Sequence, residues 1–343
     1  MASIKEVAQR AGVSIATVSR ILNGTAKVDA AKERAVREAI AYYRYEPNQF
    51  GRGLVKQSSE MIGVYFYHAN HSPLDTTYNL ELLKGAQEVL SRKNFSVVLM
   101  TEQGGPGDGT GWEPSFYRFV RRKQIDGLIL GGLSPYMIQD DNFRQLIESG
   151  FPLSYIGKKF RQHGMNVYAQ FEQYHVEMLR QLYSLGHRRI LLFEGSYHSH
   201  YLENILRQAA RLYPDAVVET TMAEGMADKA RLKDDLRSAV ARGVTGVCCP
   251  GIREAEHLLS CCAEAGIPVP GRLSVLSVEH RQDEGASFLP PISAMYVPAR
   301  QMGRQAAEQL VGALQNEETA PQVEFKAVFV PRATVGPARV ETV

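Results

Sequence analysis

The sequence predicts a small all-α helix-turn-helix headpiece, followed by an α/β core of two doubly wound parallel-sheet lobes. Three observations lead to this prediction. The first 43 residues show helical apolar spacing that is interrupted by a glycine turn. From Met61 onward, short apolar runs alternate with amphipathic helical stretches. Eight such strand–helix units are too many for one hydrophobic core, so two α/β lobes are expected.

End signals predict the first two helices. Ser3 and Glu6 have the spacing of a capping box, which satisfies free amides at a helix start. Gly12 stands where a helix must turn through a left-handed conformation, and Ser14 can cap the helix that follows. The apolar side chains that can pack the two helices together are Val7, Ala8, Val13, Val18 and Ile21. The opposite face of the second helix keeps Ile15, Ala16, Ser19 and Arg20.

This exposed face suits the major groove of DNA. The groove admits an α-helix, and Ile15 and Ala16 can contact thymine methyl groups. Arg20 can pair with guanine O6 and N7. The phosphate backbone would be contacted by Ser14, Thr17 and Asn23. Spacing alone fits an ordinary α-domain equally well, so the interpretation depends on the residue string itself.

A third helix is predicted over residues 30–43, with Asp29 as its N-cap. Its apolar stripe can close a three-helix head. Residues 1–58 hold ten Lys and Arg against five Asp and Glu, whereas the whole chain holds 39 against 37. A basic head on a mildly acidic body fits a head that meets phosphate.

Residues 4–24 resemble the DNA-binding headpiece of the LacI/GalR family of bacterial repressors. The resemblance implies that residues 47–60 form a hinge, which in this family folds into a helix on operator DNA. Leu54 occupies the position of a leucine that wedges into the minor groove. Asn48 and Arg52 are expected to contact DNA beside it. Gly51 and Gly53 depart from the family pattern and should each cost a helix about 1 kcal/mol, so we expect a hinge that is disordered without DNA.

The core resembles periplasmic sugar-binding proteins, whose fold this family shares. Further matches lie at 185–190, 290–303 and 331–334. The domains expected are a headpiece at 1–46, a hinge at 47–60 and an effector-binding and dimerisation core at 61–343. Within the core, the first lobe is expected at about 61–158 plus 292–318, and the second at about 159–291 plus 319–343. The resemblance implies that the chain crosses between the lobes three times.

Ligands of this fold bind in the cleft beyond the carboxyl ends of the strands. By position, the expected effector-binding residues are His68, Tyr78, Glu102, Gln170, Tyr197, Arg253 and Glu279. Of the positions that grip sugar hydroxyls in the family, only Glu279 preserves the chemistry. Two alternatives follow: the ligand is something other than a simple sugar, or the pocket is vestigial.

Other function classes find little support. Apolar runs are too short to span a bilayer and the N-terminus lacks a signal peptide, so a cytoplasmic, nucleoid-associated bacterial protein is expected. The cysteine pairs 248–249 and 261–262 are expected to be reduced, buried thiols rather than a metal site. The glycine-rich stretch 104–111 lacks the ending of a phosphate-binding loop. We find no catalytic constellation, and expect no enzyme activity, metal or cofactor.

The function predicted is therefore a transcriptional regulator, most simply a repressor. It would bind a near-palindromic, double-stranded operator as a homodimer. A small-molecule effector, a sugar or another metabolite, would switch it from the cleft between the lobes. The alternative is an effector-independent DNA-binding repressor with a vestigial pocket.

Overall fold

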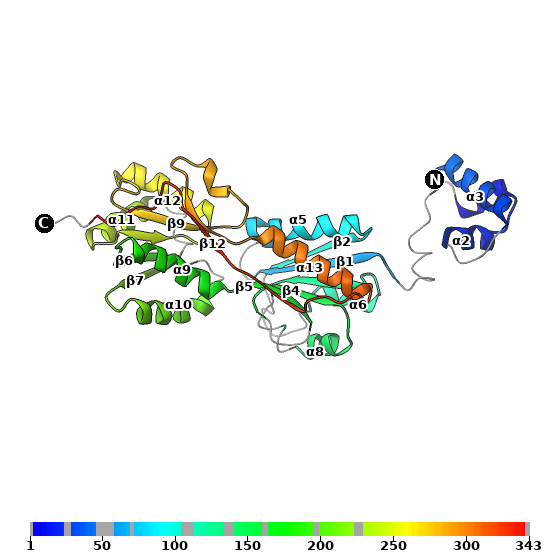
Figure 1. Ribbon diagram of the computed structural model, residues 1–343, viewed down its shortest axis with the longest axis horizontal. Coiled ribbons are helices and arrows are strands. Elements are labelled where there is room, and N and C mark those ends of the chain that lie inside the picture. The colour runs from blue at the N-terminus through cyan, green and yellow to red at the C-terminus, as the bar shows by residue number, and fades with distance from the viewer. Residues whose placement is uncertain are drawn as a thin grey trace. The chain divides into compact units, whose positions relative to one another are not determined.

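The computed structural model describes residues 3–23, 29–45, 58–68, 72–103, 113–132, 137, 140–159, 164–194, 199–222 and 229–339. The chain divides into two compact units, Met1–Glu60 and Met61–Val343 (Figure 1). This division coincides with the expected end of the hinge. The hinge residues predicted to contact DNA, which are Asn48, Arg52 and Leu54, lie outside the described residues, as do Gly51 and Gly53.

The first unit contains three helices, α1 (Ile4–Ala11), α2 (Ile15–Asn23) and α3 (Ala30–Tyr43). The predicted capping residues and the predicted turn glycine are found at the ends of these helices. The Ser3 amide donates to the Glu6 carboxylate at 2.7 Å, and Gly12 is left-handed with φ 65°. Asp29 accepts from the amide of Ala31 at 3.0 Å. The helices close on a small core of Val7, Ala8, Val18, Val36 and Ala39.

The second unit contains two six-stranded sheets. The first has the order β11-β5-β4-β3-β1-β2, and the second β12-β10-β9-β8-β6-β7. Described neighbours are parallel except β10 and β12, which are antiparallel. The first-sheet strands are β1 (Met61–His68), β2 (Ser96–Gln103), β3 (Gly127–Gly131), β4 (Leu153–Gly157), β5 (Met165–Ala169) and β11 (Gln322–Phe325). The second-sheet strands are β6 (Arg189–Glu194), β7 (Val217–Met222), β8 (Gly246–Cys248), β9 (Ser274–Glu279), β10 (Ser293–Tyr296) and β12 (Val328–Val330).

Helices accompany each sheet, which gives the two α/β lobes that the sequence predicts (Figure 1). The first lobe carries α5 (Thr77–Arg92), α6 (Phe116–Arg121), α8 (Asp141–Glu148), α13 (Ala299–Leu314) and the short helix η1 (Pro73–Asp75). The second carries α9 (Phe171–Ser184), α10 (Ser199–Leu212), α11 (Lys229–Ala241), α12 (Ile252–Ala265) and η3 (Glu284–Ser287). Among the described helices, none is long and apolar enough to cross a membrane.

The lobe boundaries that we expected are wrong at the crossovers. β5 and β11 belong to the first sheet rather than the second lobe, and β10 belongs to the second sheet. The eight predicted strand–helix units do not include β5, a five-residue strand that is buried throughout and pairs with β4. A short strand without alternation gives no periodic signal, and only its partner identifies it. The three expected crossings are present, between β5 and α9, between β10 and α13, and between β11 and β12.

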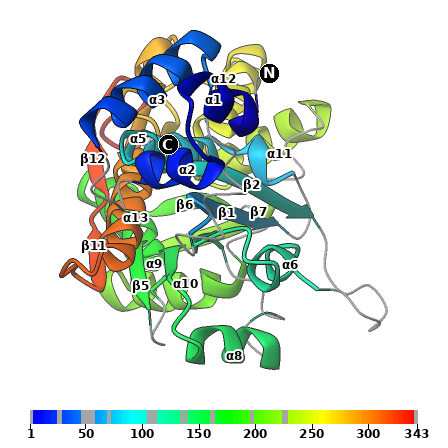
Figure 2. The ribbon, with the colours of Figure 1, turned by 90° about the vertical axis from the view of Figure 1, so that its right-hand side faces the viewer.

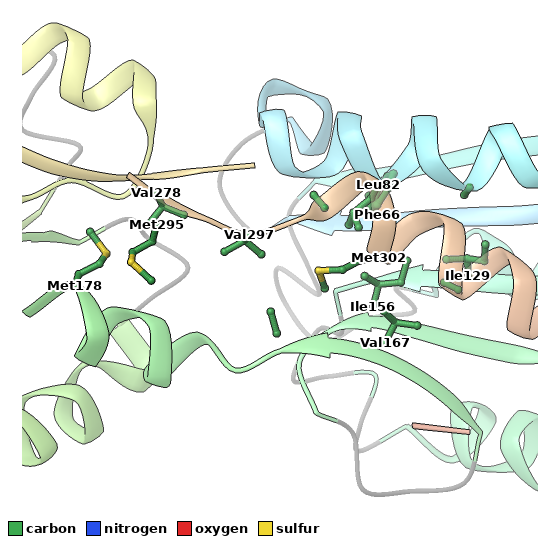
Figure 3. Packing of buried hydrophobic residues seen from close by; sticks show 14 of the residues in the cluster. Phe66, Leu82, Ile129, Ile156, Val167, Met178, Val278, Met295, Val297 and Met302 are labelled. Atoms are coloured by element: carbon green, nitrogen blue, oxygen red, sulfur yellow. The ribbon is translucent and has the colours of Figure 1, made fainter. Parts of the chain in front are cut away.

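The hydrophobic core runs continuously from one lobe into the other. Val278 and Met295 from the second lobe lie on one side of the crossing residue Val297, and Met302 and Phe66 from the first lobe lie on the other (Figure 3). The crossing between β10 and α13 is therefore buried among side chains of both lobes. Such packing couples the lobes mechanically where they are also joined covalently.

Candidate nucleic-acid interface and interlobe site

The outer face of α2 presents the side chains that the sequence singled out. Ile15 is 43% exposed, a high value for a large apolar residue, and Ala16 and Arg20 are also exposed. Ser19 and Thr17 are partly exposed. An apolar side chain beside an exposed guanidinium on the surface of a short helix suits the edges of bases in a major groove.

Ser14 has a structural role that positions this face. Its hydroxyl accepts a hydrogen bond from the amide of Thr17 at 3.2 Å and lies 2.9 Å from the Thr17 hydroxyl. It therefore caps α2, as predicted, and fixes where the first turn of the helix begins. The side chain of Asn23, which we predicted at the phosphate backbone, is not among the described ones.

A contact that sequence reasoning missed joins α1 to α3. The guanidinium carbon of Arg10 lies 3.4 Å from the centroid of the Tyr42 ring, and Tyr42 is 64% exposed. A cation on an aromatic face stabilises a surface contact by roughly 0.5–1 kcal/mol. No periodic signal in the sequence marks such a pair, because its members are 32 positions apart on the polar faces of two helices.

Aromatic and imidazole rings gather where the two lobes meet. Tyr78, at the start of α5 in the first lobe, lies with its ring centroid 4.9 Å from that of His280, just beyond β9 in the second. The first turns of α9 and α10 add more rings, with Phe171 4.0 Å from His175 and 5.4 Å from Tyr201. We call Tyr78, Phe171, Tyr174, His175, Tyr201 and His280 the junction cluster.

Burial favours the uncharged forms of the two histidines of the junction cluster and of two of its tyrosines. It lowers the pKa of His175 to about 4, and, together with the nearby His175, lowers the pKa of His280 to about 4. Burial also raises the pKa of the Tyr78 and Tyr174 hydroxyls. At neutral pH the cluster therefore offers neutral rings, hydroxyls and imidazole nitrogens.

One buried polar atom of the junction cluster has no hydrogen-bond partner within the described part of the chain. His175 Nδ1 lies 3.0 Å from the carbonyl oxygen of Phe171, whereas the buried Nδ1 of His280 has no hydrogen bond there. Buried polar atoms are normally satisfied by protein, water or ligand, so this nitrogen is a place where a bound molecule could donate or accept.

The expected effector residues do not all converge on this cluster. Tyr78 belongs to it. Arg253 lies at the same junction and donates to the carbonyl oxygen of Asp75 in the first lobe at 3.3 Å. Gln170 is at the crossing after β5 and donates to Glu324 at 2.8 Å. Glu102 accepts from the Tyr65 hydroxyl at 2.7 Å and the Ser115 amide at 2.5 Å, which ties it to the start of α6. Neither the side chain of His68 nor any part of Tyr197 is described.

The carboxylate of Glu279, which we expected to contact the effector, is bound by the protein's own groups. Its carboxylate is 1% exposed and receives both Arg332 nitrogens, at 2.8 and 3.0 Å, together with the Gly285 amide at 2.9 Å. A carboxylate that already accepts these bonds has little capacity left for a ligand. The neighbouring His280, rather than Glu279, faces the junction.

Sequence reasoning missed five of the six junction residues. Phe171, Tyr174 and His175 begin a helix that directly follows the overlooked strand β5, so their position at the lobe crossing was hidden. With β5 recognised, the aromatic first turn of α9 would have been placed beyond a strand end, where ligands bind in this class of sheet.

Comparisons with known proteins cover both parts of the chain. Residues 3–48 match the bacterial regulatory proteins of the lacI family, and residues 179–335 match a periplasmic binding protein-like domain. The chain is 24% identical to the HTH-type transcriptional regulator KdgR of Bacillus subtilis, with 97% of each chain covered. It is 23% identical to the ribose operon repressor of the same organism, over 97% of this chain and 98% of the relative.

Solved structures share the fold. The lac repressor dimer bound to operator and the anti-inducer ONPF matches with a TM-score of 0.78 and 19% identity, over 97% of this chain and 98% of that chain. The complex of the transcriptional regulator CelR with cellobiose matches with a TM-score of 0.62 and 22% identity, over 98% of this chain and 100% of that chain.

Proposed function

We infer that this chain, a member of the lacI family of bacterial regulatory proteins, represses transcription by binding a near-palindromic operator as a homodimer. The observation that carries the proposal is the exposed face of α2 on a capped three-helix head. Two such heads would place this face in successive major grooves. The relatives named above are regulators rather than enzymes, which supports a binding function.

Arg20 is the residue that we propose to read a base. It is exposed on the same face as Ile15 and Ala16, and arginine is the side chain that most often pairs with guanine. Its change to alanine should weaken operator binding by ~1–3 kcal/mol and relax the preference at one base pair. The measurement is selection of duplexes from a randomised pool with the full-length protein, followed by titration of the selected site.

Arg34→Ala is the matched control, since Arg34 is an exposed arginine on α3 of the same head. It should leave the selected sequence unchanged. If Arg20→Ala selects the same sequence as the unmodified protein, Arg20 does not read a base.

We propose the junction cluster as part of the effector site. Ribose and cellobiose appear in the names of a relative and a structural neighbour, which supports a carbohydrate, and neutral rings and hydroxyls suit such a ligand. A ligand hydroxyl could donate to His280 Nδ1. Because the cluster draws residues from both lobes, binding there would favour one lobe arrangement, and ligand and operator affinities would be reciprocally coupled.

The alternative is a repressor that needs no effector. The Glu279–Arg332 pair favours this alternative. Glu279 is the one expected ligand residue that preserves sugar-binding chemistry, and its carboxylate is bound by the protein's own Arg332. A thermal-shift screen against sugars, sugar phosphates, nucleobases and amino acids separates the two. A ligand raises Tm with its concentration by mass action.

His280→Ala should abolish the shift caused by any hit. His257→Ala is the control, because His257 in α12 also has an unpartnered ring nitrogen among the described residues but is not a member of the junction cluster. A panel without a dose-dependent shift would favour the effector-independent repressor. A shift that survives in His280→Ala would place the ligand elsewhere.

A further inference from the structure

The core begins at one end of the first sheet, the edge formed by the first residues of its parallel strands. β1 is flanked by β2 and β3, and both run parallel to it. Met61 is aligned with Ser96, and Ile62 with Gly127, so the three strands begin side by side. The chain arriving from the head enters the core at Met61, in the middle of this edge.

Basic residues flank this point on both sides. The end of α5 and the turn that leads into β2 carry Arg92 and Lys93, and the end of α6 and the turn that leads into β3 carry Arg121, Arg122 and Lys123. All five are exposed. The two turns follow α5, which packs on β1 and β2, and α6, which lies near the same strands (Figure 2). We call these five residues the basic edge.

Within the described residues, one member of the basic edge, Arg121, forms an ion pair. Arg121 is held by Glu113 at 2.5 Å, and the Arg92 Nε donates to the Glu88 carbonyl oxygen at 2.8 Å. Lys93, Arg122 and Lys123 have no ion pair within the described part of the chain. The acidic residues of the same edge are Glu60 and Asp126, so positive charge remains in excess.

A hollow of about 490 Å³ adjoins the basic edge and is lined by three arginines at α6. Arg118, Arg121 and Arg122 face it, together with Glu113, Pro114 and Ser115. Of these three arginines, Arg121 is the one that pairs with Glu113 in the described residues, and it donates to both carboxylate oxygens. Guanidinium groups that are not neutralised around a concave surface are suited to phosphate oxygens.

We propose that the basic edge binds the phosphate backbone of DNA that flanks the site read by the head. The inference rests on the proposed function. The covalent path permits such a contact, because the chain between Tyr45 and Met61, at ~3.6 Å per residue at most, limits how far this edge can lie from the head. Backbone contacts of this kind carry no sequence information and add affinity that depends on salt.

The experiment compares two duplexes that contain the selected site. One is confined to about 20 base pairs, two helical turns, and the other extends by a further turn on each side. The variant is Lys93→Ser/Arg122→Ser/Lys123→Ser. The matched control is Arg211→Ser/Arg231→Ser/Arg237→Ser. It also removes three positive charges, from exposed positions on α10 and α11. Affinity is measured against salt concentration, and thermal unfolding checks that each protein is folded.

On the long duplex, the basic-edge variant should lose at least tenfold in affinity at low salt. Its slope of log affinity against log salt should fall by about 0.9 for each phosphate that the variant no longer neutralises. On the short duplex it should equal the unmodified protein, and the control should match the unmodified protein on both.

Equal slopes for the variant and the control on the long duplex would overturn the inference. So would an equal loss on both duplexes, which would mean that the charges act at the operator or on an acidic protein partner rather than on flanking DNA. If the unmodified protein binds neither duplex, the proposed function itself is wrong.

Discussion

At the scale of single residues, the interior of the second lobe depends on one charged pair. Glu279 and Arg332 are 53 positions apart, and the side chains are 1% and 9% exposed. Arg332 also donates to the carbonyl oxygen of Ile292 at 2.6 Å. The pair therefore ties the end of β9, the start of β10 and the C-terminal segment together, where the sequence alone suggested a ligand contact.

Removing one partner should be strongly destabilising. Glu279→Ala would remove the carboxylate that accepts from both Arg332 nitrogens and leave the buried guanidinium with the exposed Asp283 at 3.6 Å, so we expect a loss of up to about 3–5 kcal/mol in the free energy of unfolding, measured with urea. The exposed pair Arg207–Glu203 provides the comparison, and Glu203→Ala should change stability by less than about 1 kcal/mol. A stable Glu279→Ala protein that has lost ligand binding would instead support a ligand contact at Glu279.

His175 makes stability depend on pH. The pKa of this histidine is about 4 in the folded protein and about 6.5 in an unfolded chain, so the unfolded state binds more protons between these values. Stability should therefore fall as the pH drops through 6.5 towards 4, by about 2 kcal/mol for this group at pH 5. Urea unfolding of the wild type and His175→Asn at pH 7 and pH 5 measures the difference. An identical pH dependence in both proteins would contradict the assignment.

At the scale of elements, α5 and α13 approach each other through glycine. A Cβ atom at Gly85 would collide with the Arg300 carbonyl oxygen, and one at Gly303 with the Leu82 carbonyl oxygen. Exposed arginines also join the two helices. Arg300 and Arg304 of α13 both bind the carboxylate of Glu88 in α5 and lower its pKa. The helix that follows a lobe crossing is thereby fixed against the helix that begins at the junction cluster.

Gly303→Ala should force these helices apart, because the obstructing atoms belong to backbone. We expect a loss of about 1–3 kcal/mol, the range for overpacking a tight interior. Gly150→Ala tests a turn glycine with φ 73°, where a Cβ would meet open space and the cost should be confined to about 1–2 kcal/mol of backbone strain. Calorimetric Tm values of the two variants compare the effects. An unchanged Tm for Gly303→Ala would show that the helix pair can adjust.

At the scale of the whole molecule, each unit has its own hydrophobic interior. One cluster lies within residues 1–60, and the other three lie within residues 61–343. The lobes of the second unit are joined further by polar contacts at the junction, where the Thr77 hydroxyl donates to Glu284 at 3.0 Å and Arg253 reaches the Asp75 carbonyl oxygen. A ligand that strengthens or breaks these contacts would shift the lobe equilibrium.

A chain that begins at Ser58 should therefore fold without the head. We expect its calorimetric Tm to agree with that of the main transition in the full-length protein to within a few degrees, since the three clusters within residues 61–343 are all retained. It should keep any ligand response and lose operator binding. A drop of Tm well beyond that margin would show that the units depend on each other.

The sequence by itself determined the features that local chemistry encodes. The helix ends of the head depend on hydrogen bonds and turns that form within a few residues, at Ser3, Gly12, Ser14 and Asp29. The three helices of the head could therefore be predicted from the sequence alone. The alternation of apolar runs and helical stretches likewise fixed the two α/β lobes, and the four cysteines are free and buried, as expected.

Only the tertiary structure decided what depends on distant partners. β5 is recognisable as a strand because β4 and β11 pair with it, and the Glu279 carboxylate is engaged by Arg332, which lies 53 positions later in the chain. The junction cluster likewise exists only once Tyr78 and His280, 202 positions apart, are brought together across the lobes. Pairings over such separations leave no periodic or spacing signal in a single chain, which is the physical reason that the fold class was predictable and the junction cluster was not.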